Sequence, residues 1–377
     1  MKTKMITVVL ILISIVSCRE DVINSPDIGS DGDPMDTWMQ VRVKFELTVG
    51  NIYYPNTDAE FRVSGYNEQD VEQWNQTFSY TGGQPNDLTL KTGMHHYRIE
   101  ASAWGVSTAQ IYNGNDLWKE RVRDGSVPLT RVFTKSIEPK SIAYCVHSKQ
   151  ELVNGEVVMV PYAKVVFEYN TDRTVKAINY YDFDESPGVF IPTKQSKFSY
   201  GSAGVSTIIT NDVNNHQRVS VDWYTYEASA RLARIIHQDF NSDITTEVGI
   251  TYNENNRIIN ATYSLSNGGS FEYEFLKKAD NVISDRTTNG SELCNTGNYE
   301  YDRNVNPLKH LGYVDYLFRN YSISNRLTES VEYKACGFPT LIPERYSYTY
   351  DADGYPSIVT THYKNSEGTT QIEYVYQ

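Results

Sequence analysis

A short pattern recurs through the second half of the chain: an aromatic-x-Tyr segment, a polar turn, and then a segment carrying Val or Ile. Successive tyrosines fall 26 residues apart at Tyr200, Tyr226 and Tyr252. A fixed period of this size indicates stacked supersecondary units. Because the turns are rich in Asn, Asp and Gly, which tolerate a positive φ, each unit is predicted to be a β-hairpin. We therefore expect residues 155–377 to form an antiparallel β-meander of hairpin repeats, curved or closed so that its edges are covered.

Two segments depart from this repeat. Asn306 and Pro307 open a run of apolar residues at roughly helical spacing, and Asn followed by Pro is typical of a helix start. We predict one short helix near residues 307–319, packed on the sheet. Residues 227–238 fit either a helix or a hairpin, and the flanking repeats favour the hairpin.

The region before the repeats has the pattern of a small β-domain. Apolar and polar residues alternate without a break from Val41 to Val49, which predicts a strand with one buried face. Leu88 and Leu90 precede a turn glycine and then Tyr97, a pattern that resembles the tyrosine-corner region of immunoglobulin-like sandwiches. About six or seven short strands fit between residues 37 and 140. We expect an all-β chain, with an immunoglobulin-like β-sandwich over residues 37–140.

The N-terminal residues have the pattern of a targeting signal. Lys2 and Lys4 precede an apolar run that ends at Cys18, and this run is too short to span a bilayer as a helix. It resembles a bacterial lipoprotein signal, which implies that residues 1–18 end in a lipidated Cys18. An ordinary secretory signal with an incidental cysteine is the alternative. Several acyl chains on one cysteine would give stable membrane anchoring.

Residues 19–36 form an acidic tether without apolar periodicity. Its first residues, Arg19, Glu20 and Asp21, resemble the surface-export signal of Bacteroidetes lipoproteins, although a solvated acidic spacer has the same composition. We expect a protein anchored to outer-membrane lipid through Cys18, either surface-exposed or facing the periplasm.

The segment from Tyr348 to Ile358 resembles the YD repeat of Rhs and teneurin shells. The whole of residues 155–377 is similar to the C-terminal YD-like domain found in a group of uncharacterised Bacteroidetes surface lipoproteins. This resemblance implies a fold and a cellular address, and it implies no activity.

Charge and motifs exclude several function classes. The chain has 34 Lys and Arg against 47 Asp and Glu, a net charge of -13, and nonspecific nucleic-acid binding needs a basic surface instead. The sequence lacks the metalloprotease His-Glu-x-x-His, the Gly-x-Ser-x-Gly elbow, a phosphate-binding glycine loop and Cys-x-x-Cys. We predict no catalytic residue, no metal ligand and no cofactor.

Two groups of residues remain as candidates for ligand contact. Asp182, Asp184 and Glu185 could flank a glycosidic bond as acid and base, but their Pro-Gly context favours a solvated loop. Aromatic rings near the strands and turns of the repeats could stack on sugar faces, or they could be core and cross-strand pairs. The rings singled out are Tyr180, Tyr181, Trp223, Tyr224, Tyr226 and Tyr355.

Three cysteines remain besides Cys18. The compartment outside the inner membrane permits disulfides, and Cys294 and Cys336 bracket the predicted helix. A disulfide between them would close a loop of about 40 residues and contribute about 4 kcal/mol in the chain-entropy model. Cys145 is left over, and three free thiols are the alternative.

These observations favour an envelope-anchored, non-catalytic binding or adhesion module, with a glycan or an envelope protein as its partner. The alternative is a carbohydrate-active hydrolase that uses the acidic residues 182–185. A structural component of an outer-membrane complex is a third, weaker interpretation.

Overall fold

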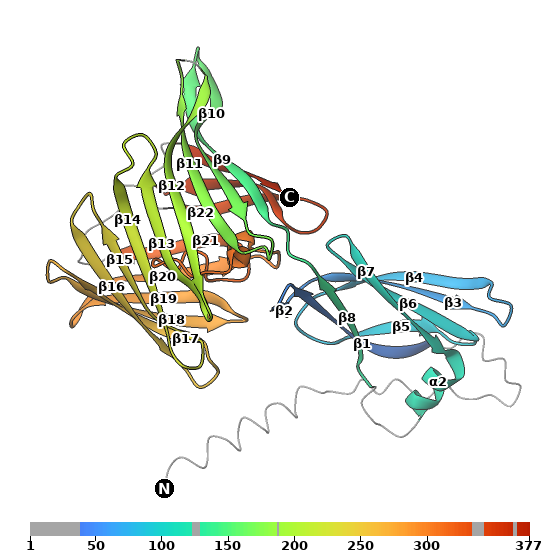
Figure 1. Cartoon of the computed structure of the whole chain (residues 1–377). Helices are drawn as coiled ribbons and strands as arrows, with labels where there is room; N and C mark the ends of the chain where they lie inside the picture. The colour runs from blue at the N-terminus through green and yellow to red at the C-terminus, as the bar shows by residue number, and fades with distance from the viewer. Residues whose placement is uncertain (1–37, 123–128, 187, 334–342, 365–367) are drawn as a thin grey trace, which may run out of the picture.

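The computed structural model describes residues 38–122, 129–186, 188–333, 343–364 and 368–377. Strands dominate this part of the chain, which divides into an N-terminal pair of sheets and a closed barrel that lie side by side (Figure 1). No helix among the described residues is long and apolar enough to cross a membrane.

The N-terminal part consists of two four-stranded sheets around one core. The first sheet has the order β2-β1-β5 with β8 beside β1, formed by β1 (Trp38–Val49), β2 (Ile52–Tyr54), β5 (Asn86–Lys91) and β8 (Arg131–Ile137). The second has the order β4-β3-β6-β7, formed by β3 (Ala59–Tyr66), β4 (Glu72–Tyr80), β6 (His96–Ala103) and β7 (Val106–Asn113). The helix α2 (Gly114–Val122) follows β7.

The alternation predicted for residues 41–49 is confirmed, because β1 buries every second side chain. Phe45 of β1, Phe61 of β3 and Phe133 of β8 meet in the core between the two sheets. The Tyr97 hydroxyl donates to the backbone carbonyl of Lys91, and this bond ties β6 to the end of β5.

The larger part is a barrel of sixteen antiparallel strands in chain order, closed by pairing of β24 with β9. Its strands are β9 (Ile142–Val153), β10 (Glu156–Tyr169), β11 (Val175–Asp184), β12 (Val189–Gly201), β13 (Gly204–Asp212), β14 (Arg218–Tyr226), β15 (Leu232–Asp239), β16 (Ile244–Tyr252), β17 (Ile258–Leu265), β18 (Ser270–Lys278), β19 (Asn281–Asn289), β20 (Glu292–Tyr301), β21 (Arg326–Tyr333), β22 (Pro343–Tyr350), β23 (Pro356–Tyr363) and β24 (Thr369–Tyr376). Residues 227–238 form the turn and most of the second strand of the β14–β15 hairpin, as the flanking repeats indicated.

The fold expected from the sequence, an immunoglobulin-like sandwich followed by a meander of YD-like hairpin repeats, is wrong in its architecture. The closed barrel dominates the molecule. The first sheet also contains the parallel pair β1–β8, whereas an immunoglobulin sandwich is built from antiparallel sheets. The repeat pattern describes pairing within and between neighbouring hairpins, but barrel closure depends on β9, which begins at Ile142 and lacks the aromatic-x-Tyr signal.

The tyrosines of the repeat hold one end of the barrel together. In five strands the last tyrosine donates its hydroxyl to the backbone carbonyl of the first or second residue of the preceding strand. The donor-to-acceptor pairs are Tyr169 to Ile142, Tyr200 to Val175, Tyr226 to Val205, Tyr252 to Leu232 and Tyr376 to Pro356, at 2.7–3.1 Å. This tyrosine ladder explains the spacing seen in the sequence, because the same bond recurs at the same place in successive hairpins.

The connection between β20 and β21, residues 302–325, folds into the barrel and forms a plug. Its only regular element is the 3-10 helix η2 (Pro307–Leu311), which is shorter than the helix predicted near residues 307–319. Asn306 is the N-cap as predicted, and its side chain accepts from Leu308 N. Gly312, in the left-handed region with φ 77°, ends the helix early. Deeper in the barrel, Tyr224 and Tyr263 donate hydroxyl hydrogen bonds to plug carbonyls.

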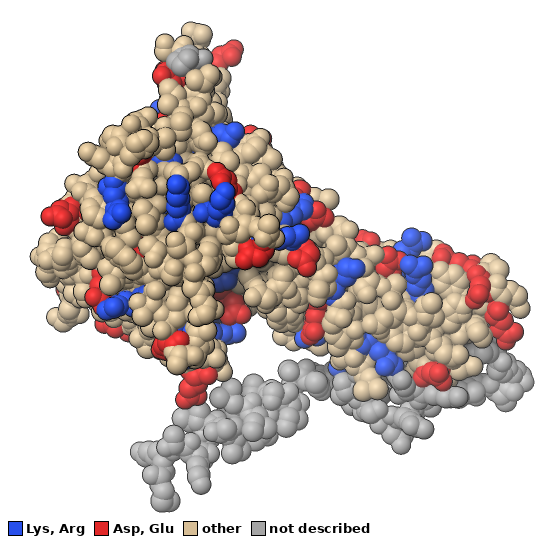
Figure 2. All heavy atoms as spheres, in the orientation of Figure 1, with Lys and Arg blue, Asp and Glu red and all other residues tan. Residues whose placement is uncertain are grey.

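The inner and outer faces of the wall differ in chemistry. Ile235, Val248 and Tyr263 lie in the core formed with the plug, so the alternating residues point outward. Ion pairs cross the outer face, Arg234 with Glu247 at 3.1 Å and Arg286 with Glu274 at 3.9 Å. Charged residues of both signs are scattered over the face shown in Figure 2. The β9–β10 hairpin, which projects beyond the wall in Figure 1, carries exposed Leu152 and Val157.

The N-terminal sheets contact the plugged end of the barrel. The Tyr54 hydroxyl lies 2.9 Å from His310 Nε2 of the plug, and Asp58 forms an ion pair with Arg303. Lys140, between β8 and β9, bridges Asp351 at 2.7 Å and Asp353 at 2.5 Å in the β22–β23 turn. The plug is therefore held both by the barrel wall and by the N-terminal part.

Candidate functional site

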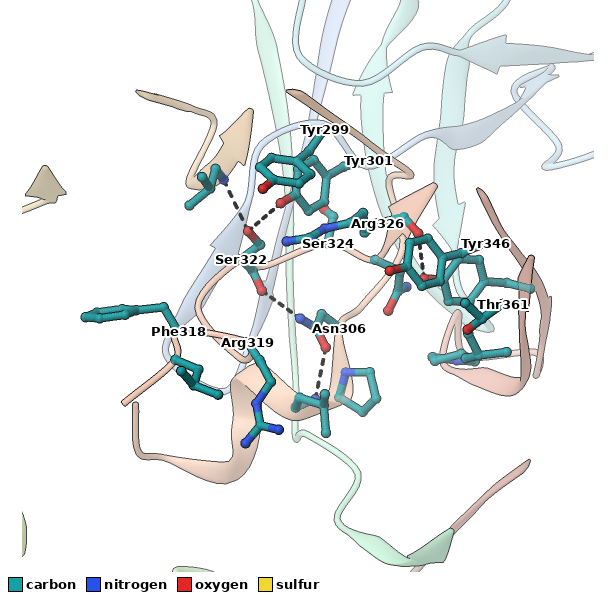
Figure 3. A pocket seen from close by; sticks show the side chains of 18 of the residues that line it. Tyr299, Tyr301, Asn306, Phe318, Arg319, Ser322, Ser324, Arg326, Tyr346 and Thr361 are labelled. Carbon is teal, nitrogen blue, oxygen red and sulfur yellow. Dashed lines mark hydrogen bonds between the residues drawn. The ribbon is translucent and has the colours of Figure 1, made fainter. Parts of the chain in front are cut away.

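The candidate site is a cavity of about 440 Å³ inside the barrel, between the plug and the wall strands β17–β24. Its wall is rich in tyrosine, contributed by Tyr263, Tyr273, Tyr299, Tyr301, Tyr346, Tyr348 and Tyr374. Alternation along each strand brings these rings inside, because tyrosines two residues apart face the same way. Phe318 and Arg319 enter the cavity from the plug. Figure 3 shows Arg326 between Tyr299 and Tyr346.

A chain of charged and hydroxyl groups crosses the wall of this cavity. The Tyr299 hydroxyl donates to Asp285 Oδ2 at 2.7 Å, and the Arg326 guanidinium lies 4.1 Å from the centre of the Tyr299 ring. Arg326 also donates to Glu329 Oε2 at 2.8 Å, and the same oxygen accepts from the Tyr346 hydroxyl at 3.0 Å. We call these five residues the lumen chain. Asp285, Tyr299, Arg326 and Tyr346 line the cavity, and Glu329 holds Arg326 and Tyr346 from behind through its hydrogen bonds.

Burial sets the electrostatics of the lumen chain. It raises the pKa of the Asp285 carboxyl, while the hydrogen bond from Tyr299 acts in the opposite direction. Burial also raises the pKa of Tyr299 and Tyr346, and the neighbouring carboxylates add to the shift because they oppose a second negative charge. Both phenols therefore stay protonated at neutral pH and act as hydrogen-bond donors.

The plug is fixed beside the cavity by its own hydrogen bonds. Asn306 Nδ2 donates to the Ser322 carbonyl at 2.9 Å, and the Ser322 hydroxyl donates to Tyr301 at 3.0 Å and accepts from Val282 N at 3.1 Å (Figure 3). These bonds connect both limbs of the plug to each other and to β19 and β20. The cavity therefore has a defined floor.

The wall is weakest next to the lumen chain. Within the described residues, β21 and β22 are joined by the single registered pair Thr328 with Arg345. A second cavity of about 590 Å³ lies at this seam, and its lining includes Glu329, Glu344 and His362. Glu329 thus connects the lumen chain to the seam.

This arrangement is suited to binding a polar, hydroxyl-rich ligand. The ring faces offer flat apolar contact, and the carboxylates and the guanidinium offer acceptors and donors for hydroxyl groups. No group of three or more His, Cys, Asp or Glu that could hold a metal ion occurs in the described part of the chain.

The structure separates the aromatic residues singled out in the sequence. Tyr180 faces the barrel core beside Cys145, whereas Tyr181 pairs across strands with Lys164 on the outer face. Trp223 lies on the outer face and is 38% exposed, and its neighbour Tyr224 is buried against the plug. Tyr226 belongs to the tyrosine ladder.

Tyr355, the sixth of these residues, is buried where the two parts meet, and its hydroxyl accepts from Lys140 N at 3.1 Å. None of the six lines the lumen cavity. Their role in ligand contact stays a prediction.

The acidic group and the cysteines lie apart from the cavity as well. Asp184 Oδ1 accepts from Ser186 N at 3.0 Å and so caps its own turn, and neither Asp182 nor Asp184 lines either cavity. Cys294 is disulfide-bonded, whereas Cys336 and Cys18 lie outside the described residues. Cys145 is a buried free thiol whose pKa burial raises to about 12.

Sequence reasoning missed the lumen chain. Tyr346 and Tyr299 belong to aromatic-x-Tyr segments and carried a usable signal, because the repeat predicts that alternate tyrosines share one face. Asp285 and Arg326 carried none, because a charged residue on the inner face has no distinguishing pattern until the barrel is closed.

No known protein-family model matches this chain, and no curated protein sequence matches it. Among solved structures, it is similar to a porin-like protein from Bacteroides uniformis ATCC 8492, with a TM-score of 0.42 and 11% identity over 63% of this chain and 99% of that one. A porin-like protein from Bacteroides vulgatus ATCC 8482 gives a TM-score of 0.31 and 9% identity over the same shares. At these TM-scores we draw no functional conclusion from either.

Proposed function

We propose that this chain is a non-catalytic binding protein of the cell envelope that takes a hydroxyl-rich ligand, such as a segment of a glycan, into the barrel lumen. The observation that carries the proposal is the tyrosine-lined cavity with the lumen chain in its wall. A volume of about 440 Å³ falls in the range typical of small-ligand sites. The N-terminal lipoprotein-like signal supplies the address.

The chemistry of the lumen favours a glycan over a purely apolar ligand. Sugar rings present C–H faces that stack on tyrosine and hydroxyls that both donate and accept. Asp285 can accept from such hydroxyls, and Arg326 can donate to them. An apolar ligand would use none of the hydrogen-bonding capacity that these groups retain beyond their bonds to one another.

The outer face of the wall supports anchoring by lipid rather than by the barrel. A strand that faces lipid carries an apolar band, and a charge at the bilayer centre costs about 2–4 kcal/mol. Here the Arg234–Glu247 and Arg286–Glu274 pairs lie on the outward face. In this proposal the barrel stands in water at the end of the tether, and lipid on Cys18 holds it to the outer membrane.

The experiment is a binding screen of the processed, lipidated chain in detergent against envelope polysaccharides and peptidoglycan fragments, with released sugar followed in the same mixtures. Tyr346→Phe and Arg326→Gln test the lumen, and Trp223→Ala is the matched control on the outer face. We expect saturable binding that weakens at least tenfold in both lumen variants and is unchanged in the control.

Binding lost only in Trp223→Ala would place the ligand on the outer face and contradict the lumen site. Sugar release that disappears in Asp184→Asn would replace the proposal with the hydrolase. A lack of binding to every glycan, together with co-purification of a membrane protein, would replace the glycan with a protein partner.

A further inference from the structure

One of eight equivalent positions in the barrel breaks the tyrosine pattern. Each even-numbered strand from β10 to β24 has a register shift near its C-terminal end. The residue just after the shift pairs with the start of the next strand, which for β24 is β9. These eight residues are Tyr169, Tyr200, Tyr226, Tyr252, Lys277, Tyr301, Tyr350 and Tyr376. Lys277 stands where seven repeats have tyrosine.

At this position a ring of the plug contacts the residue that a ladder tyrosine would reach, although through its backbone N–H instead of its carbonyl. A tyrosine at position 277 would reach Ile258, the first residue of the preceding strand, as Tyr252 reaches Leu232. Instead the Tyr321 hydroxyl of the plug accepts from Ile258 N at 3.1 Å. The Lys277 ammonium then lies against this ring, with Nζ 3.6 Å from its centre. A lysine at this position is not required for closing the barrel, since the ring contact is made from the plug.

A second lysine shares the same ring. Lys309 of η2 places its Nζ 4.8 Å from the centre of Tyr321. Neither ammonium has a carboxylate within ion-pair distance in the part of the chain that the structure describes. Asp280, whose charge acts on both lysines, is already paired with Arg257 at 3.1 Å. The positive charges of Lys277, Lys309 and Arg257 thus lie near the single carboxylate of Asp280, in a protein whose net charge is -13.

We propose that Lys277 and Lys309 form a binding site for a small oxyanion, a phosphate or carboxylate group, against Tyr321 at the plugged end of the barrel. Two partly buried ammonium groups repel one another, and an oxyanion between them would relieve the repulsion and accept charge-assisted hydrogen bonds from both. Burial and the mutual charge lower the pKa of Lys277 to about 7, which agrees with a pair that lacks its counter-charge. Such an anion would tie β18 to the plug.

The test uses the full chain with inorganic phosphate and sodium acetate as probes, and sodium chloride at equal ionic strength as the reference. Lys277→Tyr restores the residue of the other seven positions, and Lys309→Gln removes the second charge. Lys278→Gln is the matched control, because Lys278 is the exposed neighbour on the same strand. We expect calorimetry to give saturable binding to the unaltered chain and the control, weakened at least tenfold in the two site variants.

Binding of phosphate alone would assign a phosphoryl group, and binding of acetate as well would assign a carboxylate. No saturable binding to the unaltered chain, or an equal response in all four proteins, would overturn the proposal. Should Lys277→Tyr fail to fold, the Lys277 side-chain amine can be titrated by NMR in the unaltered chain, where phosphate must raise its pKa and chloride must not. This site is independent of the lumen cavity, so either proposal can fail alone.

Discussion

The hydroxyl of Tyr299 reaches the carboxylate of Asp285 across the space in front of Gly297, which is the residue paired with Asp285 on the neighbouring strand. A Cβ at Gly297 would lie 2.7 Å from Asp285 Oδ1 and would overlap the Tyr299 hydroxyl. A glycine in the middle of a strand weakens it, so its presence here indicates close approach of two side chains. Gly297 is therefore part of the lumen chain's geometry.

Gly297→Ala is expected to destabilise the barrel. The added methyl group displaces Tyr299 from Asp285 and leaves a buried carboxylate with one partner fewer, at a cost of about 1–3 kcal/mol in the free energy of unfolding. Chemical denaturation followed by tyrosine and tryptophan fluorescence measures this loss. The same variant should weaken binding of the lumen ligand.

Gly249→Ala is the control for this change. Gly249 is also a strand glycine of the barrel, but a Cβ there meets nothing closer than the Thr262 carbonyl at 4.0 Å. This variant should be neutral or slightly stabilising, because alanine has less backbone freedom to lose on folding. Equal losses of unfolding free energy in both variants would show that glycine is needed for strand geometry at both positions. The clash with Tyr299 would then not explain the effect at Gly297.

The hairpins could be predicted from the sequence, whereas the barrel could not. The period of the tyrosines reflects one hydrogen bond that recurs in successive hairpins, as at Tyr226 and Tyr252. Because this bond is local and repeated, the hairpins can be predicted from the sequence. Closure joins Tyr374 to Cys145, two residues from opposite ends of the region. No local pattern specifies that pairing, because it depends on the number of strands in the barrel and on their twist and shear.

The candidate site follows the same division. Asn306 as a helix N-cap was predicted correctly because capping is a local rule. The plug as an occupant of the barrel could not be predicted, since nothing in residues 302–325 specifies which side of the wall they enter. The lumen chain depends on both the closure and the plug.

Removing one hydroxyl from the tyrosine ladder should cost a small and similar amount wherever the ladder is regular. Tyr226→Phe and Tyr252→Phe each delete one hydrogen bond to a backbone carbonyl and keep the ring, which is expected to cost about 0.5–1.5 kcal/mol of unfolding free energy. Tyr181→Phe, on the outer face, should change stability by less than about 0.5 kcal/mol. A loss in Tyr181→Phe as large as in the ladder variants would contradict a special role for the ladder.

His310 should make the contact between the two parts sensitive to acid. Burial, and secondarily the charge of Lys309, lower the pKa of His310 from 6.5 to about 4. The unfolded chain therefore binds more protons between these values, and the free energy of unfolding should fall as the pH falls from 6.5 to 4, by about 3 kcal/mol at most. Denaturation at several pH values should show a shallower slope in His310→Asn than in the unaltered chain, and the difference between the two profiles is the contribution of His310.

His216→Asn serves as the control for His310, because His216 is exposed in the β13–β14 turn. This variant should keep the slope of the unaltered chain. A slope in His310→Asn equal to that of the unaltered chain would contradict the prediction. The acid sensitivity would then come from another group, and the 2.9 Å contact between Tyr54 and His310 would play no part in it.

Asp285 should contribute a pH dependence of the opposite sign to that of His310. Its folded-state pKa is raised above 3.8 by burial, so the folded chain binds more protons than the unfolded chain between these two values. The free energy of unfolding should therefore fall as the pH rises from 3.8 through the folded-state pKa, and Asp285→Asn should abolish this fall. Because the His310 slope has the opposite sign, the two contributions partly cancel wherever their pH ranges overlap. Subtracting the pH profile of each variant from that of the unaltered chain separates the two contributions. A difference profile for Asp285→Asn that does not change with pH would show that folding leaves the pKa of Asp285 unchanged.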